Sequence, residues 1–261
     1  RYLAPLSGGI LDAMVLGEKR YVPRFLNDAM MKSGTIHILV VSGFNVGIVS
    51  FLIMFFLKLV RLSRRWRAGL TMAGLVVYCL MTGASTPVVR STLMAAVFII
   101  GNWVKREPDI RNSCSLALLV ILLWLPEQLF NIGFQLSFSC VISLIYLYPR
   151  LNTLLKIEAV RNKYLRVPLE GFCVSLSCWL ATIGLIFYHF KMFSPVTVLA
   201  NVFIVPLATL ITLCGFSLIG AGCLSAWLAP AFASTCDLLI VLLVRLNAFL
   251  ISLPGASFYL G

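Results

Sequence analysis

Few side chains in this sequence are suited to catalysis, and they are far apart. Its two histidines, His37 and His189, belong to no H-E-x-x-H motif and to no cluster with metal-ligand spacing. No glycine-rich phosphate-binding loop indicates ATP use. Ser42 lacks the preceding glycine of a nucleophile elbow, although an intramembrane hydrolase with a Ser42–histidine dyad is an alternative. We predict that the chain is not an enzyme and has no catalytic residue, metal or cofactor.

Carboxylates are scarce inside the apolar segments. Only Asp237 lies within one, and Glu127 lies near the end of another. Ion-coupled carriers need carboxylates at membrane depth, so this scarcity argues against a proton- or sodium-coupled carrier. A solute or lipid-linked permease is a further alternative, which a titrating carboxylate would favour.

Polar residues follow helical spacing in the first apolar segment. Polar groups that face lipid are costly, so they should face the bundle interior or water. With a rotation of about 100° per residue, His37, Ser42 and Asn45 fall within one arc of about 140°. Gly43 and Gly47 lie on the other side and form a G-x-x-x-G pair, which favours close helix packing.

Three more segments carry polar stripes. They are Gln135, Ser139 and Ser143; Ser175, Thr182 and His189; and Asp237 with Arg245. Each stripe alone is explained by hydrogen bonds between helices. Together they indicate a helical bundle whose interior is polar and able to hold water.

The elements that carry these residues are expected to be transmembrane helices. Of the 261 residues, 61% are hydrophobic and 11% are charged. A helix crosses the bilayer core with about 20 apolar residues. We predict an all-α, polytopic membrane bundle of seven to eight transmembrane helices, some of them short or broken. Candidate spans are 36–60, 68–84, 88–104, 114–130, 134–149, 171–190, 195–221 and 227–251.

Two domains follow from this division: an extracytoplasmic or interfacial lead-in over 1–35, and a transmembrane domain over 36–261. Residues 83–87, Gly-Ala-Ser-Thr-Pro, should separate the second and third spans. Ser194-Pro195 should open the seventh, and Pro206 should break it. Proline after serine or threonine is typical of a helix start, and broken helices at membrane depth line cavities.

Loop charge predicts the orientation. The net charge is +12, and the loops 61–67, 105–111 and 150–166 hold four, three and five basic residues. The positive-inside rule places these alternate loops in the cytoplasm, so with eight spans both chain ends lie outside. The basic residues of 19–32 oppose this orientation. The eight cysteines form no C-x-x-C pair and are interpreted as buried apolar residues.

Five ordered motifs resemble those of the ComEC competence-protein family over residues 16–254. Residues 37–47, H-I-L-V-V-S-G-F-N-V-G, resemble H-L-L-x-x-S-G-L-H-V-G, and residues 83–90 resemble G-x-S-x-P-x-x-R. Residues 133–138 are G-F-Q-L-S-F. The closing elements of the family are similar to three further parts of this sequence: residues 188–190 (Y-H-F), Ser194, and residues 199–206 (L-A-N-V-F-I-V-P).

The resemblance implies a channel in the bacterial cytoplasmic (inner) membrane that admits one strand of DNA during natural transformation. It implies single-stranded DNA, the lipid bilayer and other DNA-uptake proteins as partners. Family members often add an OB-like domain before this region and a metallo-β-lactamase-like domain after it, and this chain contains neither. Asn45 stands where the family motif has histidine, which leaves a neutral hydrogen-bonding role.

We expect the DNA-binding or pore-lining residues to be His37, Ser42, Asn45, Ser85, Arg90, Gln135, Ser137, Ser139, Thr182, His189 and Asn201. Arg90 is the best candidate for contact with phosphate, because it lies one turn into the helix expected to start at Ser85. The alternatives are an arginine that snorkels to lipid headgroups, or one that pairs with Asp237 or Glu127.

Overall fold

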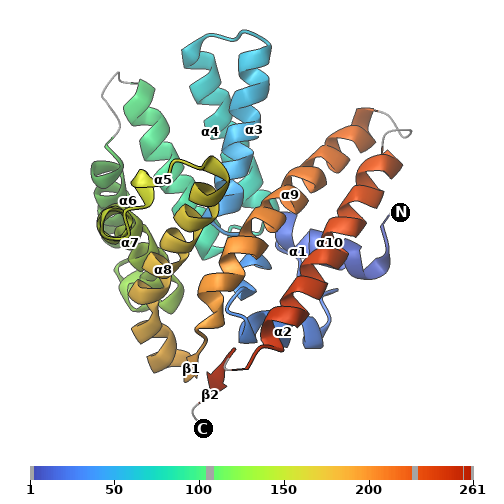
Figure 1. The fold of residues 1–261 in the computed structure, drawn as a ribbon. Coiled ribbons are helices and arrows are strands. Elements are labelled where there is room, and N and C mark those ends of the chain that lie inside the picture. Colours follow the sequence, from blue (N-terminus) through green and yellow to red (C-terminus); the bar gives the residue numbers. More distant parts are fainter. Residues whose placement is uncertain (1–2, 104–108, 225–228, 255, 260–261) are drawn as a thin grey trace. The chain divides into compact units, whose positions relative to one another are not determined.

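The computed structural model describes residues 3–103, 109–224, 229–254 and 256–259, which are almost entirely helical (Figure 1). The α-helices are α1 (Pro5–Val15), α2 (Arg24–Lys32), α3 (Gly43–Leu59), α4 (Arg64–Met81), α5 (Thr86–Trp103), α6 (Ile110–Trp124), α7 (Ile132–Leu154), α8 (Lys163–Phe190), α9 (Val196–Leu224) and α10 (Ala229–Ile251). Short 3-10 turns are η1 (Ile36–Ile38), η2 (Pro126–Phe130) and η3 (Ile157–Ala159). Strands β1 (Met192–Phe193) and β2 (Phe258–Tyr259) form one antiparallel pair. The all-α prediction is confirmed.

The described residues contain five segments that are long and apolar enough to cross a membrane. They are Ile36–Leu59, Ile132–Leu154, Lys163–Phe190, Val196–Gly220 and Ala229–Ile251. Helix α5 is apolar but shorter over Thr86–Gly101, as is α6 over Ile110–Trp124. Helix α4 begins with three arginines within four residues, which shortens its apolar part. The chain is a multi-pass membrane protein, and the count of seven to eight spans stays a prediction.

The structure corrects three details of the predicted helices. The span 36–60 agrees with the apolar segment Ile36–Leu59, but it is not one continuous helix. The turn η1 ends at Ile38, and α3 begins only after Ser42, whose backbone is extended. The helical arc that joined His37 to Asn45 therefore does not exist. Helix α8 begins at Lys163, eight residues before the predicted start at 171, and continues through Pro168. Helix α9 likewise continues through Pro206 without a break.

The chain divides into two compact units. One comprises residues 1–40 and 138–261, and the other comprises residues 41–137. This division does not follow the predicted boundary after residue 35. Whether residues 1–35 lie at the membrane surface stays a prediction.

The first unit is built around the helical hairpin α9–α10 (Figure 1). Helix α8 packs on α9, while α1 and α2 pack against the hairpin. Met14 of α1 joins Ile211 and Ile240 in the buried core. A Cβ added at Gly215 would lie 2.7 Å from Leu11 Cδ1, so α1 and α9 approach closely. The N-terminal helix is therefore part of this core.

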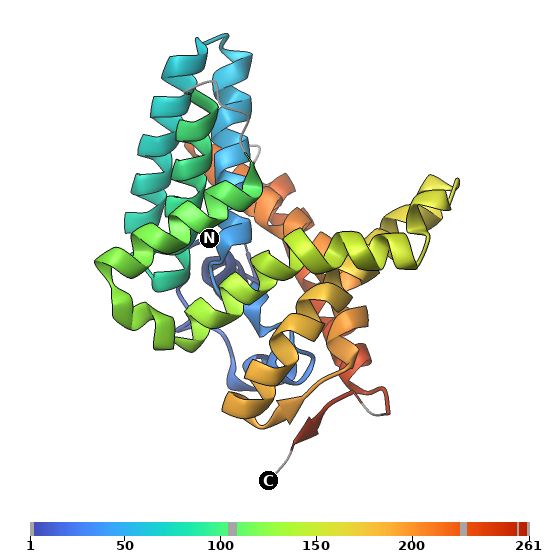
Figure 2. The ribbon, with the colours of Figure 1, turned by 90° about the vertical axis from the view of Figure 1, so that its left-hand side faces the viewer.

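The second unit is a bundle of α3, α4 and α5, with α6 packed on α5 (Figure 2). Leu75 and Val88 are fully buried between these helices. The chain reverses between α4 and α5 at Gly83 and Ala84, both of which have positive φ. This turn falls where the sequence predicted a break, within residues 83–87.

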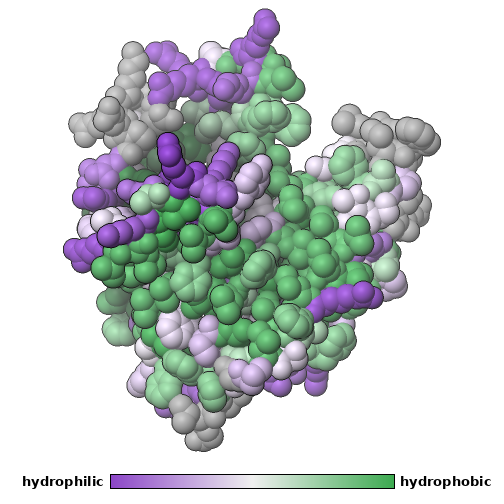
Figure 3. All heavy atoms as spheres, in the orientation of Figure 1, coloured by the Kyte–Doolittle hydropathy of each residue, from purple (hydrophilic) through white to green (hydrophobic). Residues whose placement is uncertain are grey.

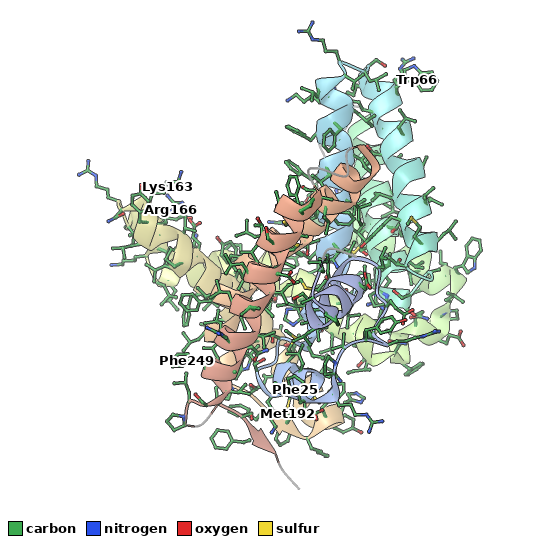
Figure 4. All side chains as sticks on the ribbon, turned by 90° about the vertical axis from the view of Figure 1, so that its right-hand side faces the viewer. Phe25, Trp66, Lys163, Arg166, Met192 and Phe249 are labelled. Atoms are coloured by element: carbon green, nitrogen blue, oxygen red, sulfur yellow. The ribbon has the colours of Figure 1, made fainter. Side chains whose placement is uncertain are left out.

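Apolar side chains cover much of the surface, as lipid-facing helices require. Figure 3 shows hydrophobic side chains over α8, α9 and α10, and hydrophilic ones at the α3–α4 turn. Phe51 on α3 and Phe249 on α10 are both more than half exposed. Figure 4 shows Lys163 and Arg166 at the start of α8 and Trp66 at the start of α4. Basic side chains thus gather at helix ends, as snorkelling residues do.

Candidate functional site

Arg90 joins two separate motifs inside the second unit. It lies on α5 and is only 4% exposed, so it is buried and not displayed on the surface. Its Nη2 donates a hydrogen bond of 2.9 Å to the carbonyl of Gly133, and its guanidinium lies 5.8 Å from the ring centroid of Phe134. The segments 83–90 and 133–138 therefore meet at one side chain.

The remaining nitrogens of Arg90 are unusual for a buried guanidinium. Both Nε and Nη1 are buried and have no hydrogen-bond partner among the described residues. The ion pairs found in the described part of the chain are Arg20–Glu18 and Arg166–Glu170, so the predicted alternative pairing of Arg90 with Asp237 or Glu127 is not seen there.

Two polar side chains form hydrogen bonds at the first turn of α7, the turn that Arg90 contacts. The side-chain oxygen of Asn131 accepts a hydrogen bond of 3.2 Å from the N–H of Phe134. Nε2 of Gln135 donates a hydrogen bond of 2.9 Å to the carbonyl of Leu129. Gln135, a predicted lining residue, thus reaches back over the start of its own helix.

The other predicted residues of the second unit lie at or near helix starts. Ser42 is the residue before α3, and Asn45 is buried one turn further along. Ser85 precedes α5, and its carbonyl accepts hydrogen bonds from the N–H groups of Val88 and Val89. The predicted start of this helix at Ser85-Thr86 is confirmed. Ser137 is half-buried on α7.

The glycine pair of α3 divides into one packed and one open position. A Cβ added at Gly43 would lie 3.2 Å from the Cβ of Ser91, so α3 and α5 approach closely there. A Cβ added at Gly47 would meet nothing within 4 Å. Close packing between helices is thus concentrated at Gly43.

A polar contact between α8 and α9 occupies the interior of the first unit. Nδ2 of Asn201 donates a hydrogen bond of 3.1 Å to the hydroxyl of Ser175, while Oδ1 of Asn201 is buried without a partner in the described part of the chain. Thr182, two turns after Ser175, is buried but donates to the carbonyl of Cys178 in its own helix. The polar stripe of α8 therefore faces α9 at Ser175.

Three predicted residues of the first unit lie apart from this contact. His37 is exposed in η1, and its Nδ1 lies 3.1 Å from the carbonyl of Gly34, to which it donates. His189 is exposed near the end of α8, and Ser139 is half-buried on α7. The functional roles of all eleven predicted residues stay predictions.

Sequence reasoning did not find a buried polar group between α2 and α10. Ser33, Thr35 and Asn247 are each fully buried. The hydroxyls of Ser33 and Thr35 lie 2.7 Å apart, and Nδ2 of Asn247 lies 3.4 Å from the Thr35 hydroxyl. An asparagine within the last apolar segment was the available signal. In the described part of the chain no three His, Cys, Asp or Glu side chains gather as a metal site would require.

Comparison with known proteins complements this geometry. The family model described as "Competence protein" matches residues 14–261. The chain belongs to the competence protein family. One relative, the "ComE operon protein 3" of Bacillus subtilis (strain 168), is 32% identical over 251 residues, which cover 94% of this chain and 30% of the relative.

A second competence-family relative is the "Competence protein ComA" of Neisseria gonorrhoeae, 30% identical over 146 residues. That alignment covers 53% of this chain and 21% of the relative. This chain thus spans less than a third of the length of both proteins. No solved structure matches it.

Proposed function

We propose that this competence-family chain forms the channel domain through which single-stranded DNA crosses the bacterial cytoplasmic membrane during natural transformation. Two features support the proposal: family membership over residues 14–261 and several helices with the length and apolarity of membrane spans. The observation that carries it is the burial of Arg90 where segments 83–90 and 133–138 meet. A buried cation inside an apolar unit suits a polyanionic substrate better than an apolar one.

The proposed lining is neutral or cationic. Asn45 and Arg90 are buried in one unit, and Thr182 is buried in the other together with Ser175, the partner of Asn201. Groups of this kind bind the sugar–phosphate backbone without reading its sequence, which import of arbitrary DNA requires. The remaining predicted residues, His37, Ser42, Ser85, Gln135, Ser137, Ser139 and His189, belong to the same proposal.

The proposal includes an orientation and partners. The basic loops 61–67, 105–111 and 150–166 face the cytoplasm, and the ends of the chain face outward. The proposed partners are other DNA-uptake proteins and the OB-like and metallo-β-lactamase-like domains of the full-length protein, of which the last would degrade the strand that is not imported. No catalytic step is assigned to this chain.

The test is DNA uptake in a naturally transformable strain in which the gene encoding this chain is the sole family member. We expect deletion of the gene to preserve surface-bound labelled DNA and to abolish nuclease-resistant DNA inside the cell. Unchanged internalisation after deletion would contradict the proposal.

Asn201→Leu tests the lining within the same assay. It removes the contact with Ser175, and we expect internalisation to fall while the folded yield survives. The matched control is Ser217→Leu, which replaces a polar side chain by leucine at an exposed position on the same helix.

A further inference from the structure

Arg90 carries donors that the described chain does not satisfy. A guanidinium has five N–H groups. The one on Nε and the two on Nη1 are buried without an acceptor among the described residues, and the side chain is 4% exposed. Leaving charged donors unpaired in an apolar interior is costly, so such groups in native proteins call for an ion, a water or a ligand.

The start of α7 adds positive potential at the same place. The first N–H groups of a helix have no acceptor within the helix, and the aligned peptide dipoles make this end positive. The side chain of Asn131 accepts the N–H of Phe134. The N–H groups of Ile132 and Gly133 lie at the start of the helix, where no carbonyl of the helix itself can accept them. Arg90 is bonded to Gly133 in this turn of the 23-residue helix. A cation and a positive helix end therefore lie together, and each favours an anion.

The described residues supply no carboxylate to balance this charge. Glu127, on the preceding turn η2, is exposed and forms no ion pair in the described part of the chain. An oxyanion with several acceptor oxygens matches the guanidinium and the helix start together. A phosphodiester has one negative charge and two free oxygens, and both structural elements are recurrent phosphate ligands.

We propose that Arg90 and the first turn of α7 form a binding site for one phosphodiester group, and that this group belongs to the DNA strand. The phosphodiester chemistry is argued from the buried donors of Arg90 and the start of α7, without the proposed function. The assignment to DNA rests on the proposed function. Burial excludes water from the site, which strengthens each charge-assisted bond to the phosphate.

The experiment measures thermal unfolding of the full-length protein in a phosphate-free maltoside detergent. The probes are dimethyl phosphate, a short oligothymidylate and a short-chain phosphatidylglycerol. The variants are Arg90→Gln, Arg90→Lys and, as the matched control, Arg245→Gln at an exposed position on α10. Each probe is titrated, and the concentration giving half of the maximal rise in Tm is recorded.

We expect dimethyl phosphate and oligothymidylate to raise the Tm of the wild type and of Arg245→Gln at the same concentrations. Loss of charge-assisted hydrogen bonds in Arg90→Gln should raise the half-maximal concentration about tenfold or more. Arg90→Lys keeps the charge without the planar donors and should fall between the two. Equal half-maximal concentrations in wild type and Arg90→Gln would overturn the site.

Two further outcomes keep the test decisive. If Arg90→Gln does not fold, Arg90→Lys decides, because a half-maximal concentration equal to that of the wild type contradicts the planar-donor site. An Arg90-dependent response to phosphatidylglycerol without one to oligothymidylate would assign the group to lipid and overturn the assignment to DNA.

Uptake measurements separate failure of this inference from failure of the proposed function. If deletion abolishes internalisation and folded Arg90→Gln restores it fully, the DNA site is wrong and the channel proposal stands. If deletion leaves internalisation intact, the channel proposal and the DNA assignment fail together. An Arg90-dependent response to dimethyl phosphate would then still support the phosphodiester site.

Discussion

The hydroxyl of Ser194 donates a hydrogen bond of 2.8 Å to the carbonyl of Lys32, which lies 162 residues earlier in the sequence. The same hydroxyl lies 3.1 Å from the carbonyl of Ala256. The carbonyl of Ser194 in turn accepts a hydrogen bond of 3.0 Å from the indole N–H of Trp179. One small residue before α9 thus connects the end of α2, the middle of α8 and the C-terminal segment.

Ser194→Ala should lower the free energy of unfolding. The carbonyl of Lys32 loses its donor, and the carbonyl of Ala256 loses a polar neighbour, at a site that is 6% exposed. Leaving a buried acceptor without its donor costs about 1–3 kcal/mol. The measurement is reversible unfolding in mixed micelles. The control is Ser217→Ala on α9, where the exposed hydroxyl bonds only to Leu213 of its own helix. A loss at Ser194 no larger than at Ser217 would contradict the connecting role.

Gly34→Ala should be more damaging than its size suggests. Gly34 has a φ of +72°, and an added Cβ would overlap the side chain of Thr197. Backbone strain alone costs about 1–2 kcal/mol, and displacement of Thr197 adds to it. Gly184→Ala, on α8 with nothing within 4 Å of the added Cβ, should be neutral or stabilising. Equal unfolding temperatures for the two variants would show that Thr197 does not approach Gly34.

The glycine pair of α3 gives a matched comparison within one helix. Gly43→Leu should separate α3 from α5, because the position already faces Ser91 at close range. Overpacking of this kind costs about 1–3 kcal/mol. Gly47→Leu points into open space and should leave stability almost unchanged. Folded yield in detergent checks both variants, and similar losses at the two positions would restore the symmetrical G-x-x-x-G interpretation.

The orientation can be tested with single cysteines in a cysteine-free background. Ser63→Cys and Tyr164→Cys, within the basic loops 61–67 and 150–166, should be shielded from an impermeant thiol reagent outside intact cells. Ala84→Cys and Lys191→Cys, at the opposite helix ends, should react. All four positions are exposed in the structure, so burial does not explain a lack of reaction. The reverse pattern of labelling would invert the topology.

Local sequence signals predicted much of the fold. Apolar blocks located the five described segments that are long and apolar enough to cross a membrane. Ser85-Thr86-Pro87 correctly indicated the start of α5. They failed where tertiary packing decides the outcome. Pro206 suggested a break, yet α9 continues through it. Helical periodicity grouped His37 with Asn45 because a projection at constant angle assumes an unbroken helix, which Ser42 interrupts.

The candidate site was harder to predict than the helices. Arg90 was identified from its motif, but its burial depends on Gly133, 43 residues away, and no local pattern encodes that pairing. The contact between Asn201 and Ser175 likewise joins two helices, and no local pattern in the sequence encodes it. Asn247 was missed because a single amide within an apolar segment has no periodicity of its own. Sequence therefore indicated the chemical types more reliably than their partners.

The division of the first unit into residues 1–40 and 138–261 has a consequence for biosynthesis. The second unit is continuous, so its helices can associate as soon as residue 137 has been made. Helices α1 and α2 cannot, because their partners α9 and α10 are translated last. At about 5–20 residues per second, Lys32 waits roughly 8–30 s for Ser194, 162 residues later. The apolar face of α1, which includes Ile10 and Met14, must be held by lipid or by the insertion machinery during that interval.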